Sequence, residues 1–400
     1  MELLWLKPLL GRPGPFVTVY LDATRAEAAG EAEAAGRWRV LRRDLERAGA
    51  AAVVLDAVED RVTRPTGVLG PHGRVLVADA AEVVLDRVLR EPPTVSTAVL
   101  DAVPVLMPAA RSADQSTRFL LVEIDRQGAD LTWSDGTGPR GAAHEVVEGG
   151  HDVLHKVREG GGWAQRRLAT RAEDSWERNA SAVAADLDRQ VAERLPEIVL
   201  VTGDVRAVAL LRDAVGARVR DLLVEVPGGS RADGVNERAF TARVAAALDG
   251  HRAALRAAVV DRYRTEQGRG RAAVTALADV VTVLQRGQVA ELLLDEVQTV
   301  PGAPLAGRTL RVGPDPLQVA GSAADLGALG VTGAGRSMPA DVALLRAALG
   351  QDAGLTIVPT GTVPLVDGVG ALLRWSDGST PSEAVPARSG DRGRLHRLAE

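Results

Sequence analysis

A glycine-rich stretch near the middle of the chain combines residues that could hold a phosphate backbone. Residues 155–180 read HKVREGGGWAQRRLATRAEDSWERNA, with three consecutive glycines at positions 160–162. Because glycine adopts positive φ values at little cost, such a loop can approach a partner closely. Between positions 155 and 171 there are five basic residues and one acid, Glu159, which gives a net charge of +4; the basic residues are Lys156, Arg158, Arg166, Arg167 and Arg171.

A long helix is predicted directly after these glycines, from about Ala164 to Leu195. The amides and the dipole at a helix N-terminus favour a phosphate near the glycines. The face of this helix that is not expected to meet the core carries Arg167, Arg171 and Arg178, whose guanidinium groups are available to bind phosphates. The alternative is a solvated helix that follows a flexible glycine loop. The apolar positions that recur at helical spacing and are expected to face a core are Ala164, Leu168, Ala172, Trp176, Val183, Leu187 and Val191.

The elements around this stretch alternate between strands and helices, which predicts an α/β fold with three domains. We place an N-terminal α/β domain at 1–115, a central domain at 116–230, and a C-terminal α/β domain with a polar tail at 231–400. The central domain is expected to hold a parallel or mixed sheet. Its predicted elements are two strands around a Gln127-Gly128 turn, the long helix, a strand at 195–204, a helix at 205–216 closed by Gly216, and a strand at 221–227.

The outer domains show the same kind of pattern. A strand at 16–22 and a helix at 26–48 open the chain, and the polar segment 111–116 is expected to separate the first two domains. Residues 301–340 are rich in Gly, Ala and Pro and are expected to form a loop or an irregular insertion. The elements predicted in the last domain are helices at 236–266, 272–287 and 341–350 and strands at 288–296 and 355–361.

Composition narrows the classes of function. The 400 residues include no cysteine, which excludes disulfides, thiolate metal sites and a cysteine nucleophile. The net charge is −5, so a protein that coats nucleic acid with its whole surface is not expected, DNA is not an expected partner, and RNA contact requires a local patch. The apolar start lacks the features of a signal peptide, and no apolar run is long enough to span a membrane. A cytoplasmic protein without membrane contact is therefore expected.

Four motifs, in their order along the chain, resemble a known family. They are FVTVYLDATR…RWRVLRRDL, RFLLVEIDRQGADL, GGGWAQRR and VLQRGQVAELLLDE, within residues 16–375. The chain resembles the class-one release factors of archaea and eukaryotes and their Pelota relatives. It is more specifically similar to the bacterial relatives of these proteins, among them actinobacterial members and Balon-like hibernation factors. The resemblance implies a central release-factor-like domain and a C-terminal ribosomal-protein-like domain that contacts translational GTPases or the ribosomal stalk base.

The resemblance also assigns a role to the glycines. In release factors a Gly-Gly-Gln tip sits in the peptidyl-transferase centre and helps water attack the peptidyl-tRNA ester. Gly161 and Gly162 match the glycine pair, and Trp163 occupies the glutamine position. A backbone N–H remains at 163, but the amide side chain is lost, and removal of one positioned donor costs a few kcal/mol of barrier. Gln165 could replace it only if the helix starts later than predicted.

Two roles for Trp163 stay open: it stacks on a base or ribose, or it packs against its own domain. The candidate catalytic tip, if hydrolysis survives, is Gly161, Gly162, Trp163 and Gln165. The predicted RNA-binding residues are Lys156, Arg158, Gly160, Gly161, Gly162, Trp163, Arg166, Arg167, Arg171 and Arg178.

Three other motifs indicate weaker possibilities. His151 and His155 have the spacing of a zinc pair, but no third ligand is evident, so no metal is expected. The segment LVTGDVRAV at 200–208 lacks a nucleotide-binding glycine pattern, and its Thr202 and Asp204 are predicted to form a turn and a helix N-cap. The segment VTGAGRS at 331–337 could cradle a phosphate, although it follows no convincing strand. No cofactor is expected.

These observations together predict a tRNA mimic that occupies the ribosomal A site during hibernation or stress. Stop-codon decoding is not expected, because the N-terminal domain lacks the lysine-containing loop motif of true release factors and Lys7 is the only lysine before residue 156. The expected partners are ribosomal RNA at the A site and a translational GTPase such as elongation factor Tu. One alternative is an enzyme, a peptidyl-tRNA hydrolase that rescues stalled ribosomes. Another is a stand-alone stress protein that acts through protein contacts.

Overall fold

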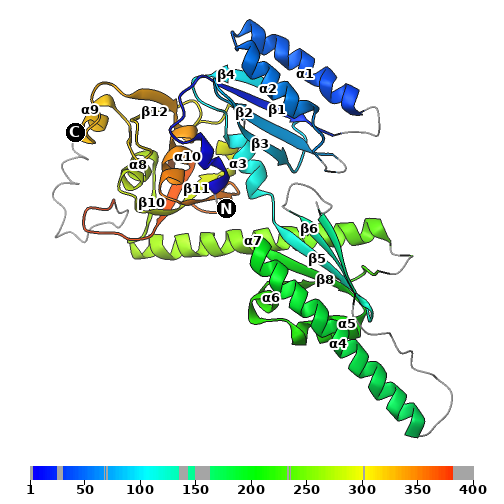
Figure 1. The fold of residues 1–400 in the computed structure, drawn as a ribbon. Helices are drawn as coiled ribbons and strands as arrows, with labels where there is room; N and C mark the ends of the chain where they lie inside the picture. The colour runs from blue at the N-terminus through cyan, green and yellow to red at the C-terminus, as the bar shows by residue number, and fades with distance from the viewer. Residues whose placement is uncertain are drawn as a thin grey trace.

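The computed structural model describes residues 3–24, 30–66, 68, 71–134, 143–148, 163–231, 234, 236–300 and 302–381. They form an N-terminal and a central unit, each built on one β-sheet, and a C-terminal unit built on two, with helices against the sheets (Figure 1). The α/β class predicted from the sequence is confirmed. Among the described residues, no helix is both long enough and apolar enough to cross a bilayer.

The N-terminal unit is an antiparallel sheet in the order β3-β2-β1-β4 that is buried on both faces. Both faces are buried because alternate residues of strand β1 point into two different cores. Val17 and Val19 pack with helices α1 and α2, whereas Phe16 and Tyr20 belong to a larger core shared with the C-terminal unit. The elements are η1 Leu4–Leu9, β1 Phe16–Asp22, α1 Gly30–Arg47, α2 Ala52–Thr63, β2 Gly73–Ala78, β3 Val83–Leu89, β4 Thr97–Asp101 and α3 Met107–Asp114.

The central unit has a mixed sheet in the order β7-β6-β5-β8-β9. Strands β5, β8 and β9 are parallel, and β6 and β7 are antiparallel to their neighbours. One face packs against α4, α5 and α6 through residues such as Leu120, Val183 and Leu187. The elements are β5 Phe119–Ile124, β6 Gly128–Ser134, β7 Ala143–Glu148, α4 Trp163–Arg194, β8 Ile198–Gly203, α5 Val205–Ala214, α6 Ala217–Leu222 and β9 Leu223–Glu225.

Helix α7, Glu237–Arg269, joins the central unit to the C-terminal unit. Its first half covers the other face of the central sheet with Phe240 and Val244. Its second half packs Val260 and Tyr263 against the C-terminal sheet (Figure 1). The predicted domain boundaries at 115/116 and 230/231 stay predictions; this helix begins just after the second boundary and contributes to the cores of both units.

The C-terminal unit contains two sheets. The larger has the order β10-β16-β11-β15, with β11 and β15 parallel, and the smaller is antiparallel in the order β13-β12-β14. The elements are β10 Ala273–Thr275, α8 Leu277–Gln285, β11 Val289–Asp295, η3 Glu296–Thr299, β12 Thr309–Val312, β13 Val319–Ala320, α9 Ala323–Ala328, β14 Arg336–Pro339, α10 Ala340–Gly350, β15 Gly354–Val358, η4 Val366–Gly368 and β16 Val369–Leu373.

Two predictions for this unit were wrong. The segment 301–340, which is expected to form a loop or an irregular insertion, contains the three strands of the smaller sheet and helix α9. The sequence pattern did not reveal these strands because they are only two to four residues long and lie between glycines and prolines. The expected helix at 272–287 is strand β10 followed by α8. The break is at Ala276, where φ is 69°, and a residue in that conformation cannot continue a helix.

The polar segment 111–116, which is expected to separate the first two domains, includes the last turn of α3, and this helix buries Ala109, Ala110 and Ala113. One prediction for the central unit was wrong. The helix expected to close at Gly216 ends at Ala214, and Gly216 precedes α6 with a φ of −64° instead of the left-handed value of a closing glycine.

Candidate functional site

Helix α4 is the element predicted to carry the site, and it extends well beyond the sheet on which it rests. At 1.5 Å per residue its 32 residues span about 48 Å. The part of the helix from Trp176 onward is held to the central unit, because Trp176, Val183, Leu187 and Val191 are all buried, as predicted. The N-terminal part projects away from the N-terminal and C-terminal units (Figure 1). The helix is therefore an arm whose free end begins at Trp163.

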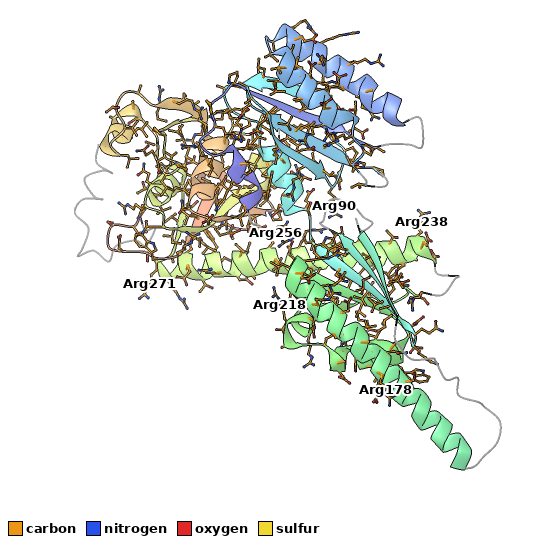
Figure 2. All side chains as sticks on the ribbon, in the orientation of Figure 1. Arg90, Arg178, Arg218, Arg238, Arg256 and Arg271 are labelled. Atoms are coloured by element: carbon orange, nitrogen blue, oxygen red, sulfur yellow. The ribbon has the colours of Figure 1, made fainter. Side chains whose placement is uncertain are left out.

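The predicted site residues fall into three groups. Lys156, Arg158, Gly160, Gly161 and Gly162 lie outside the described residues, as do His151 and His155. A second group forms the first turns of α4, with side chains outside the described set: Trp163, Gln165, Arg166, Arg167 and Arg171. Arg178 is exposed on the outer face of the helix (Figure 2).

The start of α4 bears on the role proposed for Gln165. That role required a helix that begins later than predicted, so that Gln165 would lie in the loop. The helix instead begins at Trp163, and Gln165 is in its first turn. The condition under which Gln165 could replace the family's glutamine is therefore not met.

The backbone of α4 brings three arginine positions into line. At about 100° per residue, positions 167, 171 and 178 fall within about 40° of one another around the helix axis. Arg178 is exposed, and Trp176, which lies on the opposite side of the helix, is buried with 4% of its surface accessible. Positions 171 and 167 therefore lie on the same face of α4 as the exposed Arg178, closer to Trp163.

A cluster at the base of the arm fixes its direction. The Arg126 guanidinium stacks on the Trp176 ring of α4, 4.4 Å from the ring centre. Its Nη2 donates to Asp204 Oδ2 at 3.0 Å, and the Arg126 carbonyl oxygen accepts from Asn179 Nδ2 at 2.9 Å. One arginine in the β5–β6 turn thus connects α4 with the end of β8. Cation–π contacts of this kind contribute on the order of 1 kcal/mol.

A second arginine holds the segment between β9 and α7 against the same turn. Arg231 donates from Nη1 to Asp125 at 2.9 Å and from Nε to Asp130 at 3.0 Å. Burial alone would lower the pKa of Arg231, but the two carboxylates outweigh it and raise the pKa. Neither Arg126 nor Arg231 was identified from the sequence, because their partners lie about 50 to 105 residues away and leave no local pattern.

Asp204 has a structural role, as its sequence context predicted. Its Oδ1 accepts from the backbone N–H groups of Arg206 and Ala207 at 3.0 and 3.2 Å, which caps α5. Thr202 Oγ1 accepts from Gly229 N at 3.0 Å and donates to Gly229 O at 3.2 Å, so the strand end is tied to the segment after β9. The TGD sequence at 202–204 is therefore a structural junction.

Replacement of Asp204 should destabilise the base of the arm in a graded way. Asp204→Ala removes the cap and the Arg126 ion pair, and should lower the free energy of unfolding by about 1–2 kcal/mol. Asp204→Asn keeps a capping oxygen and loses only a half-exposed ion pair, which is worth less than about 1 kcal/mol. Urea unfolding of both variants measures this difference. Equal losses in the two variants would mean that the cap contributes nothing.

Comparison with known proteins shows which family the central region is similar to. The model of bacterial archaeo-eukaryotic release factor family 2 matches residues 118–269, which cover β5 through α7 and include the arm. Two uncharacterised proteins of Mycobacterium tuberculosis, from strains CDC 1551 and H37Rv, are each 28% identical to the chain over 372 residues. The match covers 93% of this chain and 96% of each relative.

Solved structures with some similarity come from archaea and yeast. The archaeal translation termination factor aRF1 is 16% identical, covering 91% of this chain and 93% of that chain, with a TM-score of 0.22. Pelota of Archaeoglobus fulgidus is 12% identical, with coverages of 93% and 92% and a TM-score of 0.32. Dom34 of Saccharomyces cerevisiae is 10% identical, with coverages of 78% and 81% and a TM-score of 0.39.

The family model agrees with the resemblance that the hairpin, the glycines and the long helix indicated. Residues 118–269 of this chain are therefore similar to the bacterial archaeo-eukaryotic release factors of family 2.

Proposed function

We propose that this chain is a ribosome-associated translation factor that occupies the A site as a tRNA mimic, in hibernation or stress and without stop-codon decoding. The observation that carries the proposal is the projecting helix α4 within a release-factor family domain, with the basic glycine-rich sequence at its free end. Cytoplasmic ribosomes are the partner, ribosomal RNA is the surface contacted, and a translational GTPase such as elongation factor Tu is the proposed delivery partner.

The electrostatics of the chain support one defined contact over general RNA binding. The whole protein carries a net charge of −5, whereas positions 155–171 carry +4. Arginine suits this task because its planar guanidinium makes two parallel hydrogen bonds to one phosphate. An acidic body with a basic arm disfavours loose binding along RNA and allows binding at a site shaped to receive the arm.

The tip sequence supports occupancy without hydrolysis. Trp163 replaces the glutamine of the family's Gly-Gly-Gln tip, and Gln165 lies within the helix. Loss of one positioned donor lowers the rate of such a reaction by about 10²–10³-fold. We therefore propose that the arm blocks the site where the ester would be hydrolysed.

Sedimentation with ribosomes from stationary-phase cells tests the proposal. We expect the protein to pellet with the ribosomes and to release no peptide from isolated nascent-chain complexes. Failure to pellet would contradict the proposal. Peptide release that is abolished by Gly161→Ala or Gly162→Ala would instead identify the chain as a peptidyl-tRNA hydrolase.

A further inference from the structure

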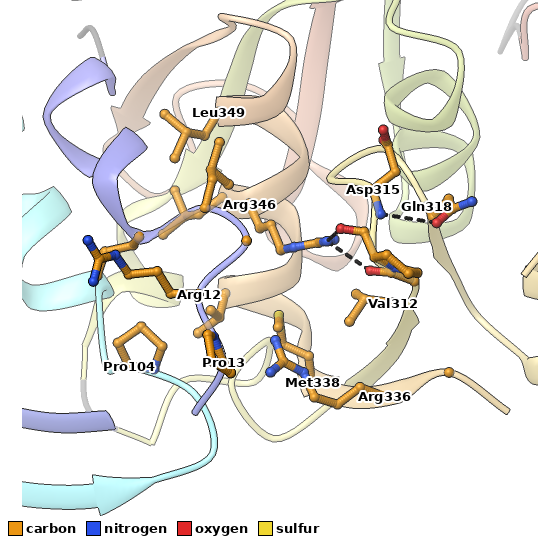
Figure 3. A pocket seen from close by; sticks show the side chains of 18 of the residues that line it. Arg12, Pro13, Pro104, Val312, Asp315, Gln318, Arg336, Met338, Arg346 and Leu349 are labelled. Carbon is orange, nitrogen blue, oxygen red and sulfur yellow. Dashed lines mark hydrogen bonds between the residues drawn. The ribbon is translucent and has the colours of Figure 1, made fainter. Parts of the chain in front are cut away.

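The C-terminal unit and the N-terminal segment enclose a cavity of about 750 Å³ that the arm does not use (Figure 3). Its walls come from η1 and the following loop, from β12 and β14, and from α10. Cavities of this size at the junction of two structural units are typical of small-molecule sites. The glycine-containing segment that the sequence singled out at 331–337 lies along it through Val331, Thr332, Gly335 and Arg336.

One side of the cavity is apolar. Leu6 and Leu9 contribute from η1, and Leu345 and Leu349 from α10. Met338 of β14 also lines the cavity, with 2% of its surface accessible. An apolar group that enters this space would leave water at a gain of about 25 cal/mol for each Å² removed from water.

The cavity lining also includes guanidinium groups. Arg346 donates to three loop carbonyl oxygens, from Nη2 to Gly313 at 2.8 Å and Pro314 at 2.7 Å and from Nη1 to Pro316 at 3.3 Å (Figure 3). These bonds fix the side chain beside the cavity and use three of its five N–H donors. Within the described part of the chain, no carboxylate lies within ion-pair distance of Arg346.

The positive charge around Arg346 is only partly balanced. Arg336, exposed at the start of β14, makes no ion pair or side-chain hydrogen bond with the described residues. Burial and the proximity of Arg336 lower the pKa of Arg346, while Asp315 acts in the opposite direction. Arg12 is already neutralised by Asp79 and Glu82, at 2.6 and 2.8 Å. Among the described residues, the charged groups that act on Arg346 are therefore one arginine, Arg336, and one carboxylate, Asp315.

We propose that this cavity binds a small amphipathic anion, with its apolar body between η1 and α10 and its anionic group between Arg336 and Arg346. A carboxylate, sulfonate or phosphate on a hydrocarbon or aromatic body has the required chemistry. The anion would neutralise the unbalanced charge, and its body would fill an apolar space of suitable size. This inference is independent of ribosome binding, because the arm and the cavity belong to different units.

The test uses the fluorescent anion 8-anilinonaphthalene-1-sulfonate and its uncharged analogue N-phenyl-1-naphthylamine, which has the same rings without the sulfonate. Titration of the full chain should give one saturable site for the sulfonate, with weaker binding of the uncharged analogue and no displacement by sulfate alone. Arg336→Gln should weaken sulfonate binding about tenfold and leave the uncharged analogue unaffected. Arg218→Gln, which removes the same charge from an exposed position on α6, should change neither (Figure 2).

NMR signals from the methyl groups of the three methionines of the chain can show where the anion binds. With ¹³C-labelled methionine methyl groups, the spectrum holds three signals, and Met338→Leu identifies the one from the cavity wall. The bound aromatic sulfonate should shift the Met338 signal more than that of Met107, which does not line the cavity. Absence of saturable binding, an unmoved Met338 signal, or unchanged affinity in Arg336→Gln would overturn the proposal.

Discussion

Gly203→Ala should destabilise the central unit by about 4 kcal/mol or more. Gly203 ends strand β8 with a φ of 132°, a conformation that L-residues with a Cβ rarely adopt. A Cβ built there would lie 1.8 Å from the carbonyl oxygen of Ile124. That carbonyl cannot move away easily, because it accepts the N–H of Asp204 at 3.0 Å beside the β5–β8 ladder. An alanine at position 203 would therefore suffer both backbone strain and a steric overlap of its Cβ with the Ile124 carbonyl oxygen.

Urea unfolding measures the effect, and a glycine at which a Cβ would meet no other atom serves as the control. Gly250 lies within α7 and has no neighbouring atom within 4 Å of the position that a Cβ would occupy. Gly250→Ala should therefore stabilise the protein by about 0.5–1 kcal/mol. An unchanged unfolding midpoint in Gly203→Ala would show that the junction between β8 and the base of the arm is far more plastic than these contacts imply.

Replacement of Arg167 and Arg171 by glutamine should weaken binding to ribosomes by about tenfold or more at low salt. The two positions lie one turn apart on α4, on the same stripe as exposed Arg178. Each arginine that neutralises a phosphate also releases a counterion, so the plot of log affinity against log salt should become shallower by about 0.7–0.9 per arginine. Affinity measurements at several salt concentrations give both quantities.

A matched double variant separates the arm from general charge effects. Arg238 and Arg271 are exposed near the two ends of α7 and make no ion pair with the described residues (Figure 2). Their replacement by glutamine removes the same charge and should leave affinity and salt dependence close to those of the unmodified chain. If the replacement of Arg167 and Arg171 leaves the affinity for ribosomes unchanged, the alternative function as a stand-alone stress protein is favoured.

The elements that could be predicted from the sequence are those with long, regular patterns. Helix α4 was predicted at 164–195 and lies at Trp163–Arg194, because Trp176, Val183, Leu187 and Val191 repeat at helical spacing. The β5–β6 hairpin was predicted from the turn at Gln127-Gly128, and Gly128 is the first residue of β6. In such segments local preference and tertiary burial agree, so the local pattern suffices.

The small sheet of the C-terminal unit could not be predicted, because its strands are stabilised by distant partners. Strand β12 pairs with β14, which lies more than 20 residues further along the chain, and its Leu310 and Val312 join a core shared with the N-terminal unit. A four-residue strand shows too little alternation for its pattern to be seen. The cavity was missed for the same reason, since its lining residues come from both ends of the sequence.

The base of the arm was likewise not visible in the sequence. Arg126 stands in a turn, where arginine is unremarkable, and its partner Trp176 lies 50 residues later. The sequence indicated that Trp176 faces a core, and this is confirmed. It did not indicate that the ring also contacts the Arg126 guanidinium, which connects α4 with the end of β8. Contacts between positions far apart along the chain follow from the fold and not from the local residue pattern.

A density map of the protein bound to the ribosome would test the proposed function directly. We expect the chain to lie in the A site, with the Trp163 end of α4 at the peptidyl-transferase centre and the arginine positions of α4 against ribosomal RNA. Density for the chain at another site, or with α4 pointing away from the peptidyl-transferase centre, would contradict it.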